Sequence, residues 1–417
     1  MKTETFNLAV LGAGSGGLVC AAGASGLGAK VLLIEKHKMG GDCLNTGCVP
    51  SKALIKSAKI AAHVRDAGKF GIHVESSHVD FRAIMERVQS TVRAIEPHDS
   101  PERFRSLGVQ VEFGPGSFVG PHEVSNGEKT FRAKKIVIAT GSRPAIPAIE
   151  GLDRVPVLTS ENIWELRELP KKLVVIGGGP IGCELAQCFV RFGSQVTVLN
   201  RGERLLERDD KEASAALLNV FRSEGIKVEL QADPKRVIEA EGKTTLEYAK
   251  KDGTLAAVEC TALLVAAGRL PNLENLNLDA VGIRYNARAI EVNDRLQTSL
   301  SHVYACGDVA GPYLFTHTAD FQARAILRNA LFPGSKPVNY RVIPWCTYTD
   351  PEIAQVGLTE AGARQNGTAY DVTRYDLKDL DRAICDGTNH GFVKVLTEKG
   401  RDAILGATLV GVHAGDL

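Results

Sequence analysis

The sequence lacks an excess of charge of either sign. Its 417 residues carry 50 lysines and arginines against 49 aspartates and glutamates, a net charge of +1 with histidine neutral. A large nucleic-acid or membrane-surface footprint normally needs a basic excess, so we expect no nucleic-acid partner. Aromatic residues are sparse at 6%, and no segment is of low complexity. A charged fraction of 24% and a hydrophobic fraction of 44% are typical of globular chains and argue against disorder.

The sequence also lacks the cysteine pattern of a secreted disulfide scaffold. Its nine cysteines are odd in number and scattered over a long chain. This pattern fits a reducing compartment, in which any real disulfide is catalytic. We therefore expect a cytoplasmic protein.

The N-terminal run 5–29 carries no charged residue, which mimics a signal peptide or a membrane-spanning helix. Seven glycines fall within it, however, and each costs about 1 kcal/mol in a helix relative to alanine. A nucleotide-binding turn explains the same residues better, so we expect no membrane insertion.

Two segments share one pattern of strand, glycine-rich turn, helix and strand. The first runs from Phe6 to Glu35 and carries Gly12, Gly14 and Gly17 at the turn. The second runs from Leu173 to Asn200, and its turn carries glycines at the matching places, Gly177, Gly179 and Gly182. In this pattern the first glycine permits a tight turn, the second lets a pyrophosphate approach, and the third lets the helix pack on the strand. Two such units predict two dinucleotide-binding domains.

The two units differ at the end of their second strands. Glu35 can take ribose hydroxyls in the first unit, whereas Asn200 stands at the matching position in the second. Arg201 and Arg204 follow Asn200. A missing carboxylate removes repulsion against a 2′-phosphate, and an arginine can pair with one, so the second unit favours NADPH over NADH. NAD remains open, because both arginines could simply be solvated.

The most informative segment contains Cys43 and Cys48, within Gly-Gly-Asp-Cys-Leu-Asn-Thr-Gly-Cys-Val-Pro-Ser-Lys from Gly40 to Lys52. Four residues between the cysteines allow a disulfide that can open and close at the start of a helix. A helix N-terminus and a nearby lysine favour the attacking thiolate form of a cysteine. A cysteine pair beside such a unit in an intracellular chain is therefore interpreted as redox-active. We expect the other seven cysteines to be structural, and no metal site.

Several further elements are predicted. Apolar spacing indicates helix over roughly 52–107, and short strands meet at hairpin turns at Asn126-Gly127 and Asp252-Gly253. A buried strand leads into Ala139, Thr140 and Gly141, and a strand and turn at 303–308 precede a helix near 315–331. Strand-like runs at 391–397 and 403–410 and a short helix at 359–365 suggest a third, smaller α+β unit.

The cysteine segment resembles the redox-active site of the class I pyridine nucleotide-disulfide oxidoreductases, which include dihydrolipoyl dehydrogenase, glutathione reductase and mercuric reductase. The resemblance runs from residue 6 to the end and covers Ala139-Thr140-Gly141, the motif Ala267-Gly268-Arg269-x-Pro271-Asn272, and Ala305-Cys306-Gly307-Asp308. The segments around Asp99 and Glu352 look most like the mercuric-reductase-like branch.

The resemblance implies FAD at the first turn, with Glu35 on the adenosine ribose and Asp308 on the ribityl chain and phosphates. It implies that Lys52 and Glu184 form a charged pair beside the reactive edge of the flavin. Cys48 would be the flavin-proximal thiol and Cys43 the interchange thiol that meets substrate. Electrons would pass from NAD(P)H to FAD, then to the disulfide, then to substrate.

Two features of the family are missing from these 417 residues. One is a C-terminal His-Pro…Glu element, whose histidine serves as acid and base for the thiols of the partner subunit; the other is the C-terminal vicinal cysteine pair of mercuric reductases. We therefore expect a C-terminally truncated form, or thiols that work without their usual acid and base.

The sequence predicts an α/β flavoprotein with two Rossmann-like dinucleotide-binding domains, similar to glutathione reductase, and a partial α+β interface domain. The expected bounds are 1–150 and 271–335 for the FAD domain, 151–270 for the NAD(P) domain, and 336–417 for an incomplete dimerisation domain. The predicted activity is reduction of a disulfide, thiol or Hg(II)-type substrate by a homodimer. Alternatives are dihydrolipoyl dehydrogenase activity, from dithiol to NAD, and a flavin-binding form without turnover.

Overall fold

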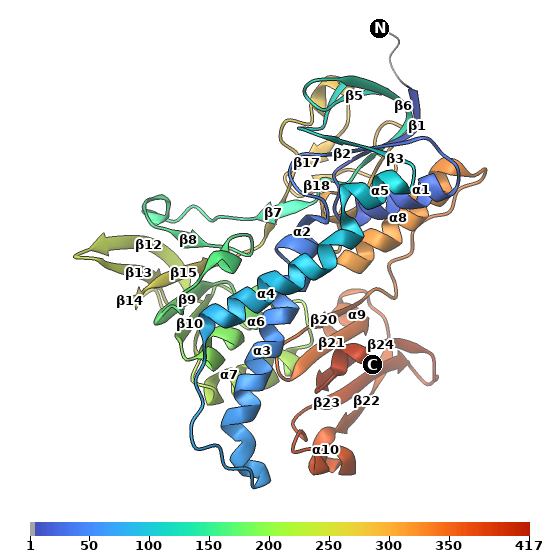
Figure 1. Ribbon diagram of the computed structural model, residues 1–417. Coiled ribbons are helices and arrows are strands. Elements are labelled where there is room, and N and C mark those ends of the chain that lie inside the picture. Colours follow the sequence, from blue (N-terminus) through green and yellow to red (C-terminus); the bar gives the residue numbers. More distant parts are fainter. Residues whose placement is uncertain (1–4) are drawn as a thin grey trace. The chain divides into compact units, whose positions relative to one another are not determined.

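The computed structural model describes residues 5–417, which fold into two compact units (Figure 1). Unit 1 contains the described part of Met1–Pro50 together with Gln89–Arg143 and Arg269–Tyr340. Unit 2 contains Ser51–Val88, Pro144–Gly268 and Arg341–Leu417. Each unit has its own sheets and its own apolar core.

Unit 1 is built on a sheet of order β3-β2-β1-β6-β5-β4, with β19 also paired to β6. The strands β3, β2, β1, β6 and β19 are parallel, whereas β4, β5 and β6 are joined in antiparallel pairs. Their bounds are β1 Thr5–Leu11, β2 Val31–Glu35, β3 Val109–Phe113, β4 Ser117–Gly120, β5 Glu123–Ser125, β6 Thr130–Ile138 and β19 Val303–Ala305. The turn between β5 and β6 contains the predicted Asn126-Gly127 hairpin.

Both faces of this sheet are covered, which explains why its central strands end in unbroken apolar runs, 8–11 in β1 and 136–138 in β6. Leu8 and Val10 of β1 pack with residues of α1 (Ser15–Gly26) and α8 (Thr316–Leu331), two helices that lie side by side (Figure 1). The alternate residues Ala9 and Leu11 point to the other face and pack with the β4–β6 ribbon. The unit also contains α2 Gly41–Asn45, α5 Pro101–Ser106, β16 Arg269–Pro271, β17 Tyr285–Asn286 and β18 Ala289–Ile290.

Unit 2 contains the second predicted nucleotide-binding unit, a parallel sheet of order β11-β10-β9-β15-β8. Its elements are β8 Val157–Leu158, β9 Lys172–Ile176, α6 Pro180–Phe192, β10 Gln195–Asn200, α7 Lys211–Ser223, β11 Lys227–Leu230 and β15 Ala262–Val265. Leu173 and Val175 pack against α6 and α7 on one face. Val174 and Ile176 pack on the other face against the antiparallel strands β12 Asp233–Ala240, β13 Lys243–Ala249 and β14 Leu255–Cys260. The β13–β14 connection holds the predicted Asp252-Gly253 turn.

The C-terminal part of unit 2 is an antiparallel sheet of order β20-β21-β24-β23-β22 with two short helices. The bounds are β20 Pro344–Thr347, β21 Glu352–Gly357, α9 Glu360–Gln365, β22 Tyr370–Asp376, α10 Asp381–Cys385, β23 Phe392–Glu398 and β24 Ile404–Gly411. This confirms the predicted α+β character of the region.

The helical stretch predicted over 52–107 is interrupted. It forms α3 Cys48–Asp66, α4 Phe81–Ile95 and α5, while residues 71–80 have no helical structure. Gly71 ends the first part in a left-handed conformation, with φ of +76°. The exposed run from His73 to His78 contains one apolar residue, Val74, and so supplies no apolar helical face to bury.

Candidate functional site

The first glycine-rich turn joins β1 to α1 as the sequence predicts. Gly12 has φ of +101°, and a Cβ there would lie 2.4 Å from the carbonyl oxygen of Ala139. A Cβ on Gly17 would lie 1.9 Å from the carbonyl oxygen of Gly12, so only glycine lets α1 approach the strand this closely. Gly14 differs, because its Cβ would meet only the Cα of Gly41, at 3.8 Å. The turn therefore leaves room beside Gly14, at the N-terminus of α1, where backbone amides can hold a phosphate.

The second turn repeats this geometry in unit 2. Gly177 has φ of +117°, and a Cβ on Gly182 would lie 2.1 Å from the carbonyl oxygen of Gly177. Around a Cβ on Gly179, nothing lies within 4 Å among the described residues. Both turns thus combine two sterically obligatory glycines with one open position, as dinucleotide binding requires.

Glu35 and Asn200 hold equivalent places in the two units. A carboxylate oxygen of Glu35 accepts a hydrogen bond from the backbone N–H of Ala13 at 2.7 Å. The amide oxygen of Asn200 accepts one from the backbone N–H of Gly178 at 3.1 Å. Ala13 and Gly178 each follow the first glycine of their turn, so Asn200 makes the same backbone contact as Glu35 without its charge.

Beyond Glu35 the structure has a cavity of about 450 Å³ in unit 1. His37, Lys38 and Met39, which follow β2, line one part of it, and Phe113 at the end of β3 lines another. Ligands of parallel sheets bind outside the carboxyl ends of the strands. The residues present therefore fit a dinucleotide whose pyrophosphate lies at Gly14 and whose adenosine extends past Glu35.

Cys43 lies in α2 and Cys48 opens α3. Their side chains are in contact, and the sulfurs are not bonded to each other. The contact with Cys48 and then burial raise the pKa of the Cys43 thiol, and the neighbouring Asp42 raises it further. Thr316, the first residue of α8, lies 3.3 Å from the Cys48 sulfur through its hydroxyl, and its contact with Cys43 lowers the pKa of that thiol. The structure therefore brings the two predicted redox residues together, with a hydroxyl beside both.

Asp308 lies in a polar network of unit 1. It accepts a hydrogen bond from the Ser142 hydroxyl at 2.5 Å, and the Arg269 guanidinium lies 3.6 Å away. Arg269 also donates to Ser142 and lies 3.5 Å from Asp42, next to Cys43. Burial raises the pKa of Asp308, while Ser142 and Arg269 oppose this rise.

In the segment Ala139-Thr140-Gly141, the backbone N–H of Ala139 donates to the carbonyl of Leu11 at 2.8 Å, and the other two residues are bonded to Asn272. The side-chain amide of Asn272 donates to the carbonyl of Thr140 at 2.9 Å, and its backbone N–H donates to that of Gly141 at 2.9 Å. The Thr140 hydroxyl donates to the carbonyl of Asn272 at 2.8 Å. These bonds fix the two residues that follow Ala139, which itself lies against Gly12.

Lys52 and Glu184 form the predicted ion pair in unit 2, with Nζ 3.1 Å from Oε2. The other oxygen of Glu184 accepts the backbone N–H of Tyr348 at 2.9 Å, and Lys52 also lies over the Tyr348 ring. Lys52 follows Cys48 by one turn of α3. Glu184 lies in α6, two residues after Gly182, and is nearly buried.

The candidate 2′-phosphate residues are already engaged. Arg201 is exposed and pairs with Asp233 at 2.7 Å. Arg204 turns inward and donates to the carbonyl of Glu207 at 2.5 Å. Gly268, the remaining predicted cofactor residue, has φ of +121°, and its carbonyl accepts the N–H of Ala145.

The sequence did not single out Thr316 or Ser142 as site residues, and Arg269 and Asn272 entered only as parts of a motif. Ser142 directly follows a segment that the resemblance marked, Asn272 ends another, and Thr316 opens a helix that the sequence predicts. That proximity was the available signal.

Among residues 5–417, no helix is long and apolar enough to cross a membrane.

Two dinucleotide-binding folds and a pair of cysteines in contact are typical of a dithiol oxidoreductase. The model of the pyridine nucleotide-disulphide oxidoreductases matches residues 6–323, and the model of their dimerisation domain matches residues 343–417. The chain belongs to this family. The prediction from the cysteine segment is therefore confirmed, as is the glutathione reductase-like α/β fold.

Known proteins that are similar to this chain support the same family assignment. It is 34% identical to dihydrolipoyl dehydrogenase of Chlamydia muridarum, with 99% of this chain and 89% of that protein covered. It is 34% identical to mercuric reductase of Streptomyces lividans, with 99% and 88% covered. Among solved structures it is similar to the HOCl-induced flavoprotein disulfide reductase RclA of Escherichia coli, with a TM-score of 0.86, 28% identity, and 98% and 91% of the chains covered.

These relationships make the protein an oxidoreductase that depends on FAD and a pyridine nucleotide. The matched dimerisation domain supports assembly as a homodimer, as predicted.

Proposed function

We propose that this protein carries electrons from NADPH, through bound FAD and the Cys43–Cys48 pair, to a disulfide or another thiol-reactive substrate. The observation that carries this proposal is the contact between the two cysteine side chains at the start of α3. Seven other cysteines are buried or isolated from this motif, so this pair alone combines access with a partner sulfur among residues 5–417.

FAD supplies hydride acceptance and electron-pair transfer, which no side chain provides. We assign its pyrophosphate to the turn at Gly12, Gly14 and Gly17, and its adenosine ribose to Glu35. Asp308, which Ser142 and Arg269 orient, would hold the ribityl chain. The FAD domain would span 1–150 and 271–335, the NAD(P) domain 151–270, and the interface domain 336–417.

The chemistry of the cysteines follows from their order. Reduction adds two electrons and two protons to the Cys43–Cys48 disulfide and gives two thiols. The Cys43 thiolate then attacks a substrate disulfide and releases one substrate thiol, and Cys48 attacks the sulfur of Cys43 and releases the other. Thr316 can hold a hydrogen bond to either sulfur during this exchange. We assign Lys52 and Glu184 as the charged pair at the flavin.

The donor assignment rests on Asn200. It repeats the backbone contact of Glu35 without a negative charge, which removes repulsion against a 2′-phosphate. Arg201 is the exposed cation next to it. The same substitution argues against the direction from dithiol to NAD.

We place the reaction in the cytoplasm, because nine cysteines scattered over a long chain are typical of a reducing compartment. Hg(II) is the second substrate candidate, since soft thiolates bind it. Among the described residues no group of three or more metal-ligating side chains exists. A metal substrate would therefore meet the two thiolates of Cys43 and Cys48.

An anaerobic titration with NADPH, and separately with NADH, tests the proposal. We expect a long-wavelength thiolate-to-flavin charge-transfer band to grow with NADPH. Bleaching of the flavin without this band would contradict the dithiol step and favour a flavin-binding form without turnover. Cys48→Ser is the control, since it should abolish the band while Cys385→Ser, an exposed cysteine, should leave it unchanged.

A further inference from the structure

The segment 201–210 connects the end of β10 to the start of α7 and carries Arg201 and Arg204. The Asn200 side chain donates to the carbonyl of Arg204 at 2.9 Å, which closes the segment at its first end. Arg204 in turn donates to the carbonyl of Glu207. The segment is therefore a shaped loop, and it begins at Arg201, whose guanidinium pairs with Asp233 of β12 at 2.7 Å.

The far end of this loop is held by the C-terminal sheet. The indole N–H of Trp345, in β20, donates to a carboxylate oxygen of Asp209 at 2.8 Å. Asp209 is only 4% exposed, so this bond is shielded from water. It is formed between residues 136 positions apart in the chain.

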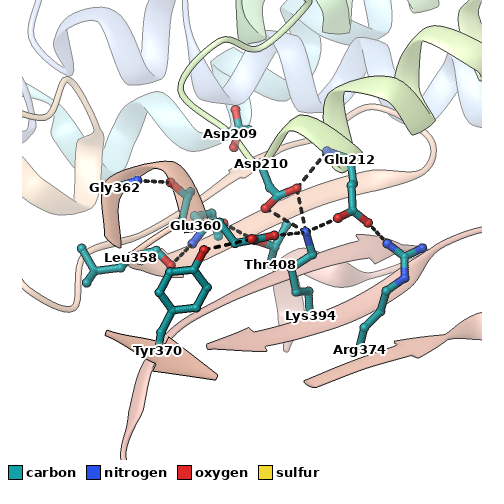
Figure 2. Close-up of polar contacts among 12 residues, drawn as sticks. Asp209, Asp210, Glu212, Leu358, Glu360, Gly362, Tyr370, Arg374, Lys394 and Thr408 are labelled. Carbon is teal, nitrogen blue, oxygen red and sulfur yellow. Dashed lines mark hydrogen bonds and ion pairs between the residues drawn. The ribbon is translucent and has the colours of Figure 1, made fainter. Parts of the chain in front are cut away.

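A second anchor is made by Asp210, the residue next to Asp209, with Lys394 (Figure 2). Nζ of Lys394, in β23, lies 3.1 Å from both oxygens of Asp210, 2.5 Å from Glu212 and 3.0 Å from Glu360. Lys394 is 1% exposed, and Arg374 pairs with Glu212 from the neighbouring strand. Asp210 is also the N-cap of α7, where it accepts the backbone N–H of Glu212.

The stability of this charged cluster depends on the exact placement of its side chains. Each buried charge has lost its hydration, and only well-placed partners offset that loss. Removing the ammonium would leave the buried carboxylate of Asp210 facing the partly exposed carboxylates of Glu212 and Glu360. Asp210 therefore has one favourable position, between Lys394 and the N-terminus of α7. This position also fixes the last residues of the loop, which precede Asp210 in the chain.

We propose that Trp345 and Lys394 are positioning residues that set the conformation of the loop 201–210 and thereby the preference for NADPH over NADH. This inference rests on the proposed NADPH specificity. It assigns to the C-terminal sheet a part in choosing the electron donor, in addition to its part in dimerisation.

The test measures the reductive half-reaction of the holoenzyme, which needs no knowledge of the final substrate. Flavin bleaching is followed by stopped flow against increasing NADPH or NADH, and gives a Kd for each. Trp345→Phe removes the indole N–H together with part of the indole ring and keeps a six-membered aromatic ring. We expect the ratio of NADH Kd to NADPH Kd to fall by roughly fivefold, the scale of one lost hydrogen bond.

The matched control is Trp164→Phe. Trp164 also donates its indole N–H, to the carbonyl of Ser160 at 2.7 Å, but it follows β8 at the opposite edge of the same sheet. This variant should keep the wild-type ratio. Lys394→Met should lower the ratio further, and Lys394→Arg should restore part of it; if the Met variant does not fold, Trp345→Phe alone decides.

The outcomes are distinct. A loss of affinity that is equal for both nucleotides, or an unchanged ratio in a folded Trp345→Phe variant, would overturn the positioning role alone. A wild-type enzyme that prefers NADH would overturn the proposed donor, and the positioning role with it.

Discussion

The stability of the protein should depend on pH through Asp209, and replacing this residue with asparagine should remove that dependence. Burial raises the pKa of Asp209 from its ordinary 3.8 to about 6, while the Trp345 N–H and Arg204 oppose the rise. In the variant Asp209→Asn, the amide would keep an oxygen to accept the Trp345 N–H without carrying a charge.

The sign follows from the direction of the change. Because the pKa is higher in the fold than in the unfolded chain, the fold retains a proton between about pH 4 and 6 that the unfolded chain has lost. The stabilisation is complete below pH 3.8 and is lost as pH rises through 6. The difference between about 6 and 3.8, at about 1.36 kcal/mol per pH unit, is worth about 3 kcal/mol.

The assay is thermal unfolding of wild type and Asp209→Asn from pH 4 to 7.5. Other titrating groups are common to both proteins and cancel in the difference. We expect the variant to gain about 3 kcal/mol over wild type across this range, or about 6–12 °C in Tm for a cooperative unit of 150–250 residues. Trp345→Phe should move the wild-type step to higher pH, because its N–H lowers the pKa of Asp209. A difference between wild type and Asp209→Asn that is constant with pH would refute the reasoning.

Three further changes have defined outcomes. Asp42→Asn should shift the alkylation of Cys43 in the reduced enzyme to lower pH, measured by mass spectrometry, because the Asp42 charge raises the pKa of that thiol; an unshifted pH profile would contradict this. Gly17→Ala should lose both thermal stability and FAD, since its Cβ would clash at 1.9 Å, whereas Gly14→Ala should fold and lose mainly FAD affinity, read from circular dichroism and flavin absorbance. Arg201→Ala should weaken NADPH binding by roughly tenfold and leave NADH unchanged, and equal weakening of both would argue against a 2′-phosphate contact.

The two nucleotide folds could be predicted because their signals are local. Gly12 and Gly17 are required by clashes within one turn, and the flanking strands are apolar because both faces of each sheet are covered. The pairing of Cys43 with Cys48 is equally local. The residue bounds of the three domains and the roles of the site residues stay predictions.

The contacts that join distant parts of the chain could not be derived in this way. Lys394 meets Asp210 across 184 positions, and no motif links them. A signal did exist, however. The alternation of β23 puts Lys394 on the same face as the buried Phe392 and Leu396. A lysine at such a position indicates either that the strand register is wrong or that its charge is paired inside the protein. The partner could not be named, because three carboxylates from two elements supply it.

The comparison of the two turns shows where the specificity of the protein is concentrated. Both turns need the same two glycines and the same side-chain oxygen on the backbone N–H that follows the first of them. That oxygen can come from a carboxylate or an amide, so the fold itself does not choose between Glu35 and Asn200. The choice must therefore come from the ligand: a ribose with free hydroxyls gains from the charged acceptor, and a ribose with a 2′-phosphate is repelled by it. Under the proposed assignment, the donor preference would come from the charge missing at Asn200 and from Arg201 beside it, at the start of a loop that Trp345 and Lys394 contact at its far end.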